Sequence, residues 1–198
     1  MKAEFLGPDC PGRAQVQAHI QKIYLDAYGA SVTEFAPLLV ATRNASGDIL
    51  CAAGIRTAAD GFFSDTYLQG DFATALSART GQTIAPTNIM EVVSLATATP
   101  FPVLAMLDAM IDWGRARGMS WGVFTATARL RRLLERTGLS YTRLCPADPA
   151  HIDDPQPWGR YYQTDPWVCA FSEPQSAPVI LSPRKRRAGG DMPFEGQS

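Results

Sequence analysis

The most constraining feature of the sequence is a strand–helix–strand–helix series in its second half. Ile89–Ala96 is rich in Val, Ile and Leu, which predicts a buried strand, and the apolar spacing after it predicts a helix that ends at Gly118. Trp121–Thr125 is predicted to be the next strand, and Ala128–Thr137 an arginine-rich helix. Because parallel strands need long crossover connections, this series predicts parallel pairing.

An antiparallel hairpin is expected before this series. Leu38–Ala41 and Ile49–Thr57 are strand-like and flank a turn-forming segment, and a helix is expected at Arg13–Tyr28. The other expected elements are a short lead-in strand, a short helix over Phe72–Arg79, and late strands at Tyr141–Cys145 and Trp167–Phe171. This order predicts an α/β fold with a mixed central sheet, antiparallel in its N-terminal half and parallel in its C-terminal half, with helices on both faces.

Length and charge restrict the class of protein. The chain has 198 residues and a formal net charge of −1, which suits one domain and argues against the basic face of a nucleic-acid-binding protein. Residues 1–172 are predicted to form a single domain. Residues 173–198 are rich in proline, glycine and basic side chains, and we expect a disordered tail there.

Other sequence features disfavour export, membrane insertion and metal chemistry. The N-terminal residues lack the apolar core of a secretory signal, and the longest apolar stretch, Phe101–Ile111, contains Asp108 and is about half of a bilayer span. The four cysteines have no metal-binding spacing, and the two histidines, His19 and His151, have no spacing partner. We therefore expect a cytoplasmic protein with no transmembrane segment, no metal and no tightly bound cofactor.

The element order resembles the GCN5-related N-acyltransferase (GNAT) fold. That resemblance implies that the sheet splays between Ile89–Ala96 and Trp121–Thr125. It also implies that the gap receives an acyl-pantetheine arm, whose thioester meets an amine. Acetyl-CoA enzymes of this fold carry a glycine-rich loop after the first of these strands, whose amides cradle the pyrophosphate. Here residues 96–102 contain no glycine, and Pro100 and Pro102 lack amide donors.

This departure leaves the acyl donor open. Acyl-homoserine-lactone synthases and long-chain N-acyl amino acid synthases share the fold and also depart at this loop, and many of them use an acyl carrier protein. The resemblance therefore implies a pantetheine thioester co-substrate, carried either by an acyl carrier protein or by CoA.

Several motifs resemble the bacterial thermostable hemolysin family over about residues 28–170. The most specific are Phe124-Thr125-Ala126-Thr127 and Trp158-Gly159-Arg160-Tyr161-Tyr162. The chain departs from the family pattern at Asp65, at Pro86-Thr87-Asn88 and at Val93-Ser94, which predicts a substrate different from the family norm. The family name implies lysis of red cells, which a lipid or lipoamino acid product would explain without a pore.

Three residues are candidate catalytic groups. Glu91 lies in an otherwise apolar strand, and a buried carboxylate needs a partner. It either forms a structural ion pair with Arg56, or it binds or deprotonates the attacking amine, directly or through water. Asp65 and Tyr67 are either a loop carboxylate and a core tyrosine, or groups that bind a cationic amine and protonate the leaving thiolate.

Other residues are candidates for substrate binding. Thr125 and Thr127 close the strand at the implied gap, where they either support secondary structure or contact the pantetheine arm. Tyr161 and Tyr162 are either core packing or pocket walls. Ser94 is a binding candidate rather than a nucleophile, since no histidine is placed to activate it. Arg56 is included as a substrate-binding residue if it does not simply pair with the buried carboxylate.

The arginine-rich helix offers a separate candidate surface. Arg129, Arg131 and Arg132 form either a solvated face or a patch for phosphate or an acidic carrier protein. We assign substrate binding to Arg129 and carrier docking to Arg131 and Arg132.

Taken together, these features favour an acyltransferase that moves an acyl group from a pantetheine thioester to the amine of a small metabolite. The alternatives are a membrane-active effector without catalysis and a non-catalytic module that binds a carrier protein. An enzyme requires Glu91, Asp65 and the Thr125 end of its strand to converge on one cleft. An effector requires an exposed apolar surface.

Overall fold

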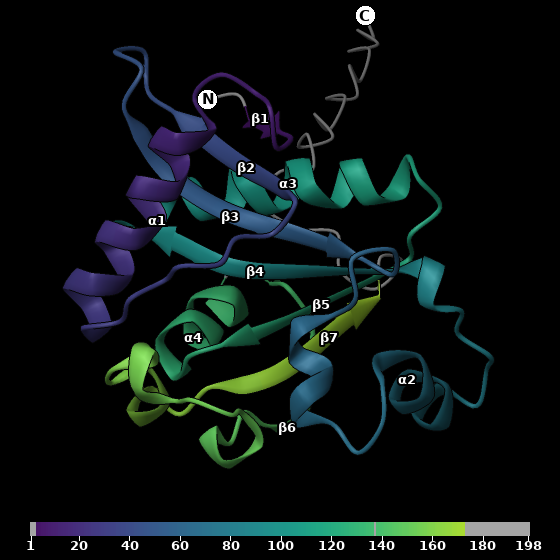
Figure 1. Ribbon diagram of the computed structural model, residues 1–198. Coiled ribbons are helices and arrows are strands. Elements are labelled where there is room, and N and C mark those ends of the chain that lie inside the picture. The colour runs from purple at the N-terminus through teal and green to yellow at the C-terminus, as the bar shows by residue number, and fades with distance from the viewer. Residues whose placement is uncertain (1–2, 137, 173–198) are drawn as a thin grey trace, which may run out of the picture.

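A seven-stranded mixed sheet organises the computed structural model, which describes residues 3–136 and 138–172 (Figure 1). The strand order is β1-β2-β3-β4-β5-β7-β6. The strands are β1 (Ala3–Leu6), β2 (Leu38–Arg43), β3 (Ile49–Thr57), β4 (Ile89–Thr97), β5 (Trp121–Ala126), β6 (Thr142–Pro146) and β7 (Trp167–Ser172). The helices are α1 (Arg13–Tyr28), α2 (Phe72–Thr80), α3 (Phe101–Arg115) and α4 (Ala128–Arg136). The expected tail at 173–198 lies outside the described residues.

The strand pairing confirms the mixed sheet and limits its parallel part. β1 to β4 pair antiparallel in sequence order, and β4 pairs with β5 in parallel. β7 then lies between β5 and β6 and pairs antiparallel with both. β6, which follows α4, is therefore parallel to β5 but is not its neighbour in the sheet. The expectation of a parallel C-terminal half is wrong in this respect, because β7 occupies the intervening position.

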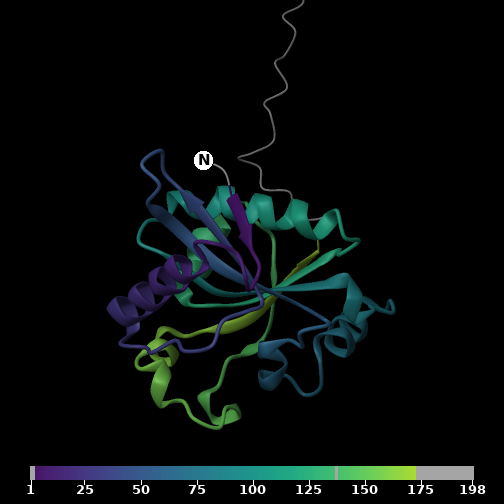
Figure 2. The ribbon, with the colours of Figure 1, turned by 45° about the horizontal axis from the view of Figure 1, so that its top comes forward.

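Helices cover both faces of the sheet, as expected. The apolar residues of α3 and α4 pack with one face in a core that includes Val40, Ile55, Val92 and Phe124. On the opposite face, α1 packs against β2 and β3, and the α2 segment packs against β4, β5 and β7. Figure 2 shows α1 and α3 on opposite sides of β2 and β3.

β4 and β5 separate before either strand ends, as the resemblance to the GNAT fold implies. Their parallel pairing runs from Ile89–Trp121 to Val92–Phe124, although β4 continues to Thr97 and β5 to Ala126. The register between β3 and β4 shifts at this level, and Ser94 has a positive φ of 53°. Figure 1 shows the two strands diverging toward their C-terminal ends. A β-bulge of this kind bends a strand and ends its pairing.

A close contact on β5 gives a test of how tightly the sheet packs. Gly122 lies opposite Phe171 of β7, and a Cβ at Gly122 would lie 2.2 Å from two atoms of the Phe171 ring. We expect Gly122→Ala to lower the free energy of unfolding by about 1–3 kcal/mol, because the ring must move within a packed core.

The measurement is urea unfolding of the wild-type protein and the variant. Gly114→Ala in α3 is the matched control, since its Cβ would meet nothing closer than 3.5 Å and alanine favours a helix. Equal midpoints for wild type and Gly122→Ala would contradict the described packing of Phe171.

Candidate active site

Two cavities meet where β4 and β5 separate. The larger has a volume of about 500 Å³ and lies between the splayed strands, α3 and α4. The smaller has a volume of about 250 Å³ and lies between residues 31–36, the 3-10 turn at Phe63–Tyr67 and the Pro157–Trp158 segment. Five residues line both cavities: Tyr24, Val92, Ser94, Thr125 and Tyr161. The opening between the strands therefore joins the two faces of the sheet.

The larger cavity has an apolar interior and a basic mouth. The side chains that make its interior apolar are Leu107, Phe124, Leu130, Leu133, Leu139 and Phe171. At the mouth, Thr97 ends β4, Thr99 lies between β4 and α3, and three arginines belong to α4: Arg129, Arg132 and Arg136. Such a cavity suits a ligand with an apolar chain and an anionic group.

The three mouth arginines repeat at intervals of three and four residues, so they share one face of α4. Arg132 Nε donates to Ala128 O at 3.2 Å within the helix. None of the three arginines forms an ion pair with a described residue. Sequence reasoning did not include Arg136 among the candidate residues. Its position one turn after Arg132 could have shown that the two side chains share a face of the helix.

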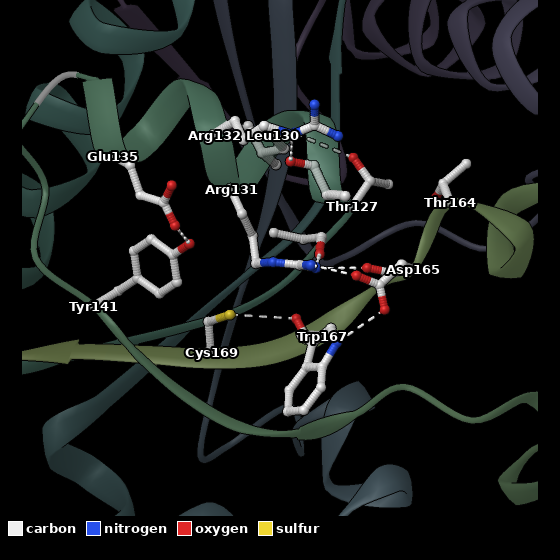
Figure 3. A network of polar contacts seen from close by, with 12 residues as sticks. Thr127, Leu130, Arg131, Arg132, Glu135, Tyr141, Thr164, Asp165, Trp167 and Cys169 are labelled. Atoms are coloured by element: carbon white, nitrogen blue, oxygen red, sulfur yellow. Dashed lines mark hydrogen bonds and ion pairs between the residues drawn. The ribbon is translucent and has the colours of Figure 1, made fainter.

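Arg131 has a structural role, and the expectation that it docks a carrier protein is wrong. Its side chain is buried, and its guanidinium donates to Ala126 O at 2.8 Å and to the Asp165 carboxylate at 2.6 Å. Figure 3 shows Arg131 pointing from α4 toward Asp165. Asp165 also accepts a hydrogen bond from Trp167 at 3.0 Å, so this network fixes α4 to the start of β7. The pattern of arginines in the sequence could not show which of them turns inward.

Glu91 is fully buried beneath the smaller cavity. Its carboxylate accepts hydrogen bonds from the backbone N–H groups of Phe63 at 2.7 Å and Ser64 at 2.9 Å. The expected ion pair with Arg56 is not formed, although the two residues are opposite each other in the β3–β4 register. Arg56 instead donates to the carbonyls of Asp60 and Gly61, both at 2.8 Å.

Burial raises the pKa of Glu91, while hydrogen bonds from Ser64 and Phe63 and the charge of Arg56 oppose that rise. A carboxyl group with a raised pKa is suited to accept a proton near neutral pH.

A hydroxyl pair connects this buried carboxylate region with the open cavities. Ser64 Oγ lies 2.8 Å from Thr125 Oγ1, and Thr125 lines both cavities. Ser64 links the two, because its backbone N–H donates to Glu91 Oε1 and its hydroxyl pairs with that of Thr125. Sequence reasoning missed Ser64, because nothing in the irregular segment around it indicated that it turns toward β4 and β5.

Asp65 does not converge on the cleft with Glu91 and Thr125, contrary to expectation. Asp65 Oδ1 accepts a hydrogen bond from Phe72 N at 2.8 Å at the start of α2, and Asp65 lines neither cavity. Burial raises its pKa, and the hydrogen bond from Phe72 opposes that rise. Asp65 therefore positions α2 relative to the segment that covers Glu91.

The tyrosines divide between the cavity and the core. Tyr67 is buried and lines the smaller cavity, and its hydroxyl lies 2.6 Å from that of Tyr162. Burial raises the pKa of Tyr67, and the hydrogen bond with Tyr162 raises it further. Tyr161 lines both cavities, as the pocket-wall interpretation expected, whereas Tyr162 lines neither. Its hydroxyl instead holds Tyr67 in place.

Thr127 caps α4 and also lines the larger cavity, while its contact with a pantetheine arm stays a prediction. Its hydroxyl accepts a hydrogen bond from Leu130 N at 3.3 Å, which caps the start of α4, and its side chain lines the larger cavity.

The described ranges show neither a metal centre nor a membrane span. Over residues 3–136 and 138–172, no cluster of three or more His, Cys, Asp or Glu side chains is arranged to hold a metal ion. No helix in that part of the chain has the length and apolar character needed to span a bilayer.

Solved structures with the same architecture support the fold. TofI in an apo form aligns with a TM-score of 0.63 at 17% identity, over 89% of this chain and 94% of that chain. FeeM, an N-acyl amino acid synthase from uncultured soil microbes, aligns with a TM-score of 0.60 at 15% identity, over 88% and 93%. The AHL synthase LasI aligns with a TM-score of 0.59 at 11% identity, over 87% and 89%. The fold is therefore that of the GNAT-like proteins.

The sequence also identifies the family within that fold class. The chain belongs to the thermostable hemolysin family, since the model of that family matches residues 6–177. No curated protein matches the sequence.

The raised pKa of Glu91 gives a test of its environment. Because the folded-state pKa lies above the ordinary value of about 4.3, the stability that Glu91 contributes is full below that value. It is lost as the pH rises through the raised pKa. We expect the free energy of unfolding of wild type, relative to that of Glu91→Gln, to fall from about pH 4 to pH 8.

Urea unfolding of both proteins at several pH values measures this difference. Glu34→Gln, at an exposed site, controls for glutamate replacement in general. If the free energy of unfolding of wild type relative to Glu91→Gln stays constant or grows with pH, burial does not dominate the pKa of Glu91.

Proposed function

We propose that this protein is an acyltransferase that moves an acyl group from a pantetheine thioester to the amine of a small metabolite. The observation that carries the proposal is the meeting of two cavities at Ser94 and Thr125, where β4 and β5 separate. The larger cavity takes the pantetheine arm and the acyl chain, and the smaller takes the amine. Holding two reactants in this way supplies a large part of catalysis.

The free edge of β4 suits the thioester carbonyl. Beyond Val92 the edge of β4 that faces β5 has no partner in that strand. Backbone N–H groups on such an edge are available to a ligand oxygen, and donors fixed in advance stabilise the oxyanion that forms when an amine attacks a thioester. The bulge at Ser94 places this edge at the junction of the cavities.

Glu91 is the proton acceptor in the proposed reaction, and it acts through hydroxyl groups. The amine passes a proton to Thr125, Thr125 passes one to Ser64, and Ser64 passes one to Glu91. The 2.8 Å separation of the Ser64 and Thr125 hydroxyls, the side-chain hydrogen bond between Ser64 and Glu91 and the raised pKa of Glu91 support this direction of transfer. The amine nitrogen bonds to the carbonyl carbon as it gives up this proton. The C–S bond then breaks, and the thiol leaves as the proton returns from Glu91 to sulfur. Protonation of the leaving group by Tyr67 remains a prediction.

The arginines at the mouth of the larger cavity indicate which part of the acyl donor binds there. Pro100, between β4 and α3, and Pro102, in the first turn of α3, lack amide donors, while three arginines on α4 line the larger cavity. In the proposed complex, Arg129, Arg132 and Arg136 bind the phosphate of the pantetheine arm on a carrier protein or on CoA. Acyl transfer on this fold has a precedent, since FeeM is an N-acyl amino acid synthase and LasI is an AHL synthase.

The described surface gives less support to a membrane-active effector. The exposed large apolar side chains in the described ranges are Leu25, Phe63 and Phe101, which lie on three different elements. An effector that inserts into lipid needs a contiguous apolar patch or face. The same cavities also disfavour a module that only binds a carrier protein, since docking does not require a second cavity.

The activity can be tested directly by incubating the protein with acyl-CoA or acyl-carrier thioesters and a library of amines. Mass spectrometry should detect an N-acyl product and free thiol. We expect Ser64→Ala to lower kcat by about 10²-fold, because it removes the hydroxyl between Thr125 and Glu91. The backbone hydrogen bonds from Phe63 and from residue 64 to Glu91 can still form.

Thr66→Ala is the matched control, because its hydroxyl bonds to His151 O outside the chain of hydroxyls. Absence of acylated product with every thioester would exclude the proposed function. Full activity of Ser64→Ala would exclude the proton path alone.

The role of the arginines is tested separately with the double variant Arg132→Glu and Arg136→Glu. We expect its KM for a phosphate-bearing donor to rise about tenfold or more, because two attractive charges become repulsive. Its rate with an acyl N-acetylcysteamine thioester, which has no phosphate, should stay at the wild-type value. Steady-state kinetics with carrier-bound, CoA-bound and N-acetylcysteamine donors provides the measurement.

Arg79→Glu, on the exposed surface of α2 and away from both cavities, is the control for net charge. Equal losses with all three donors would contradict phosphate binding at this site.

A further inference from the structure

A fixed guanidinium group lies at the wall of the smaller cavity. Arg56, on β3, donates from Nε to Gly61 O and from Nη2 to Asp60 O, both at 2.8 Å. The turn that supplies these carbonyls is itself closed, because Thr57 donates its N–H and its hydroxyl to the Asp60 carboxylate, each at 2.9 Å. Nη1 of Arg56 makes no hydrogen bond to a described residue. Arg56 is therefore held in one orientation with one nitrogen free for a ligand.

No carboxylate in residues 3–136 and 138–172 forms an ion pair with Arg56 within 4.0 Å. Glu91 is its partner in the strand register, but the oxygens of Glu91 accept hydrogen bonds from Phe63 N and Ser64 N. Arg56 is also partly buried. A partly buried charge without a contacting counter-ion favours an anionic partner, which a ligand can supply.

Aromatic side chains also line this cavity. The rings of Phe63 and Trp158 have centroids 5.8 Å apart and are tilted by 39°. Phe63 is 39% exposed, which is unusual for a phenylalanine next to an enclosed space. Trp158 also packs against Tyr161, which reaches the junction of the two cavities. Aromatic walls of this kind gain contact area when an apolar or aromatic group binds between them.

We infer that the acceptor amine is an apolar or aromatic α-amino acid, whose carboxylate binds Arg56 and whose side chain packs against Phe63 and Trp158. This inference rests on the proposed function and names its acceptor class. An α-amino acid carries its amine one carbon from its carboxylate. The amine therefore lies near Arg56, in the cavity that Ser64 and Thr125 also line. The products are an N-acyl amino acid and a free thiol.

Paired acceptors that differ only in the carboxylate test this inference. Phenylalanine and phenethylamine form one pair, and leucine and isopentylamine form another. With wild type we expect kcat/KM for the amino acid to exceed that for the amine by about tenfold or more, because a charge-assisted hydrogen bond is lost with the carboxylate. Arg56→Gln should reduce this ratio to about one, because the carboxylate then loses its charged partner.

Two further variants separate binding from folding. Asp60→Asn weakens the same turn but keeps the guanidinium that binds the carboxylate, so the ratio should stay well above one. Arg56→Lys keeps the charge and should give an intermediate ratio, which provides a result if Arg56→Gln does not fold. A structural role of Arg56 would lower the rates with both acceptors equally and leave the ratio unchanged.

The outcomes also distinguish this inference from the proposed function. Equal rates for both members of each pair, with a ratio that Arg56→Gln does not change, would overturn the amino-acid acceptor and leave the acyltransferase intact. If no amine is acylated with any thioester, the proposed function fails. Calorimetric binding of phenylalanine to wild type, lost in Arg56→Gln, would then still support the carboxylate site.

Discussion

The hydrogen-bond ladder between β4 and β5 ends at the Val92–Phe124 pair, and the positive φ of Ser94 follows two residues later. A residue other than glycine in such a conformation costs of order 1–3 kcal/mol and persists only where the surrounding structure holds it. Here β3 holds it, because β3 and β4 pair on both sides of the irregularity, with Ala52 opposite Ala96 beyond it. The antiparallel half of the sheet thus keeps the passage between the two cavities open.

Gly54 connects this opening to the smaller cavity. A Cβ at Gly54 would lie 2.7 Å from Ala36 Cβ and 2.9 Å from Val93 Cγ2. Only glycine therefore lets residues 31–36 approach the sheet beside the bulge, and that segment lines the smaller cavity. The cavity depends on a glycine, a bulge and the Phe63–Tyr67 turn together, and each lies on a different segment of the chain.

The sequence was sufficient for properties that have a local cause. Periodicity and turn residues predicted the main strands and helices, and the splay followed from the resemblance of their order to a known fold. Glu91 stood out because a charge in an apolar strand is costly. The partners of Glu91, the burial of Arg131 and the insertion of β7 could not be predicted. Each depends on how segments distant in the chain pack, and Ser64 carries no local signal at all.

The charges of the described residues divide according to position. Arg131 pairs with Asp165 and fixes α4, whereas Arg56 and the α4 row at the larger cavity form no such pair. Positive charge therefore lines both cavities, whereas Ser94 and Thr125, which line both of them where the strands separate, are neutral. In the proposed reaction, each reactant binds by a negative group at its own end. Their reactive atoms then meet beside Ser94 and Thr125, at the free edge of β4.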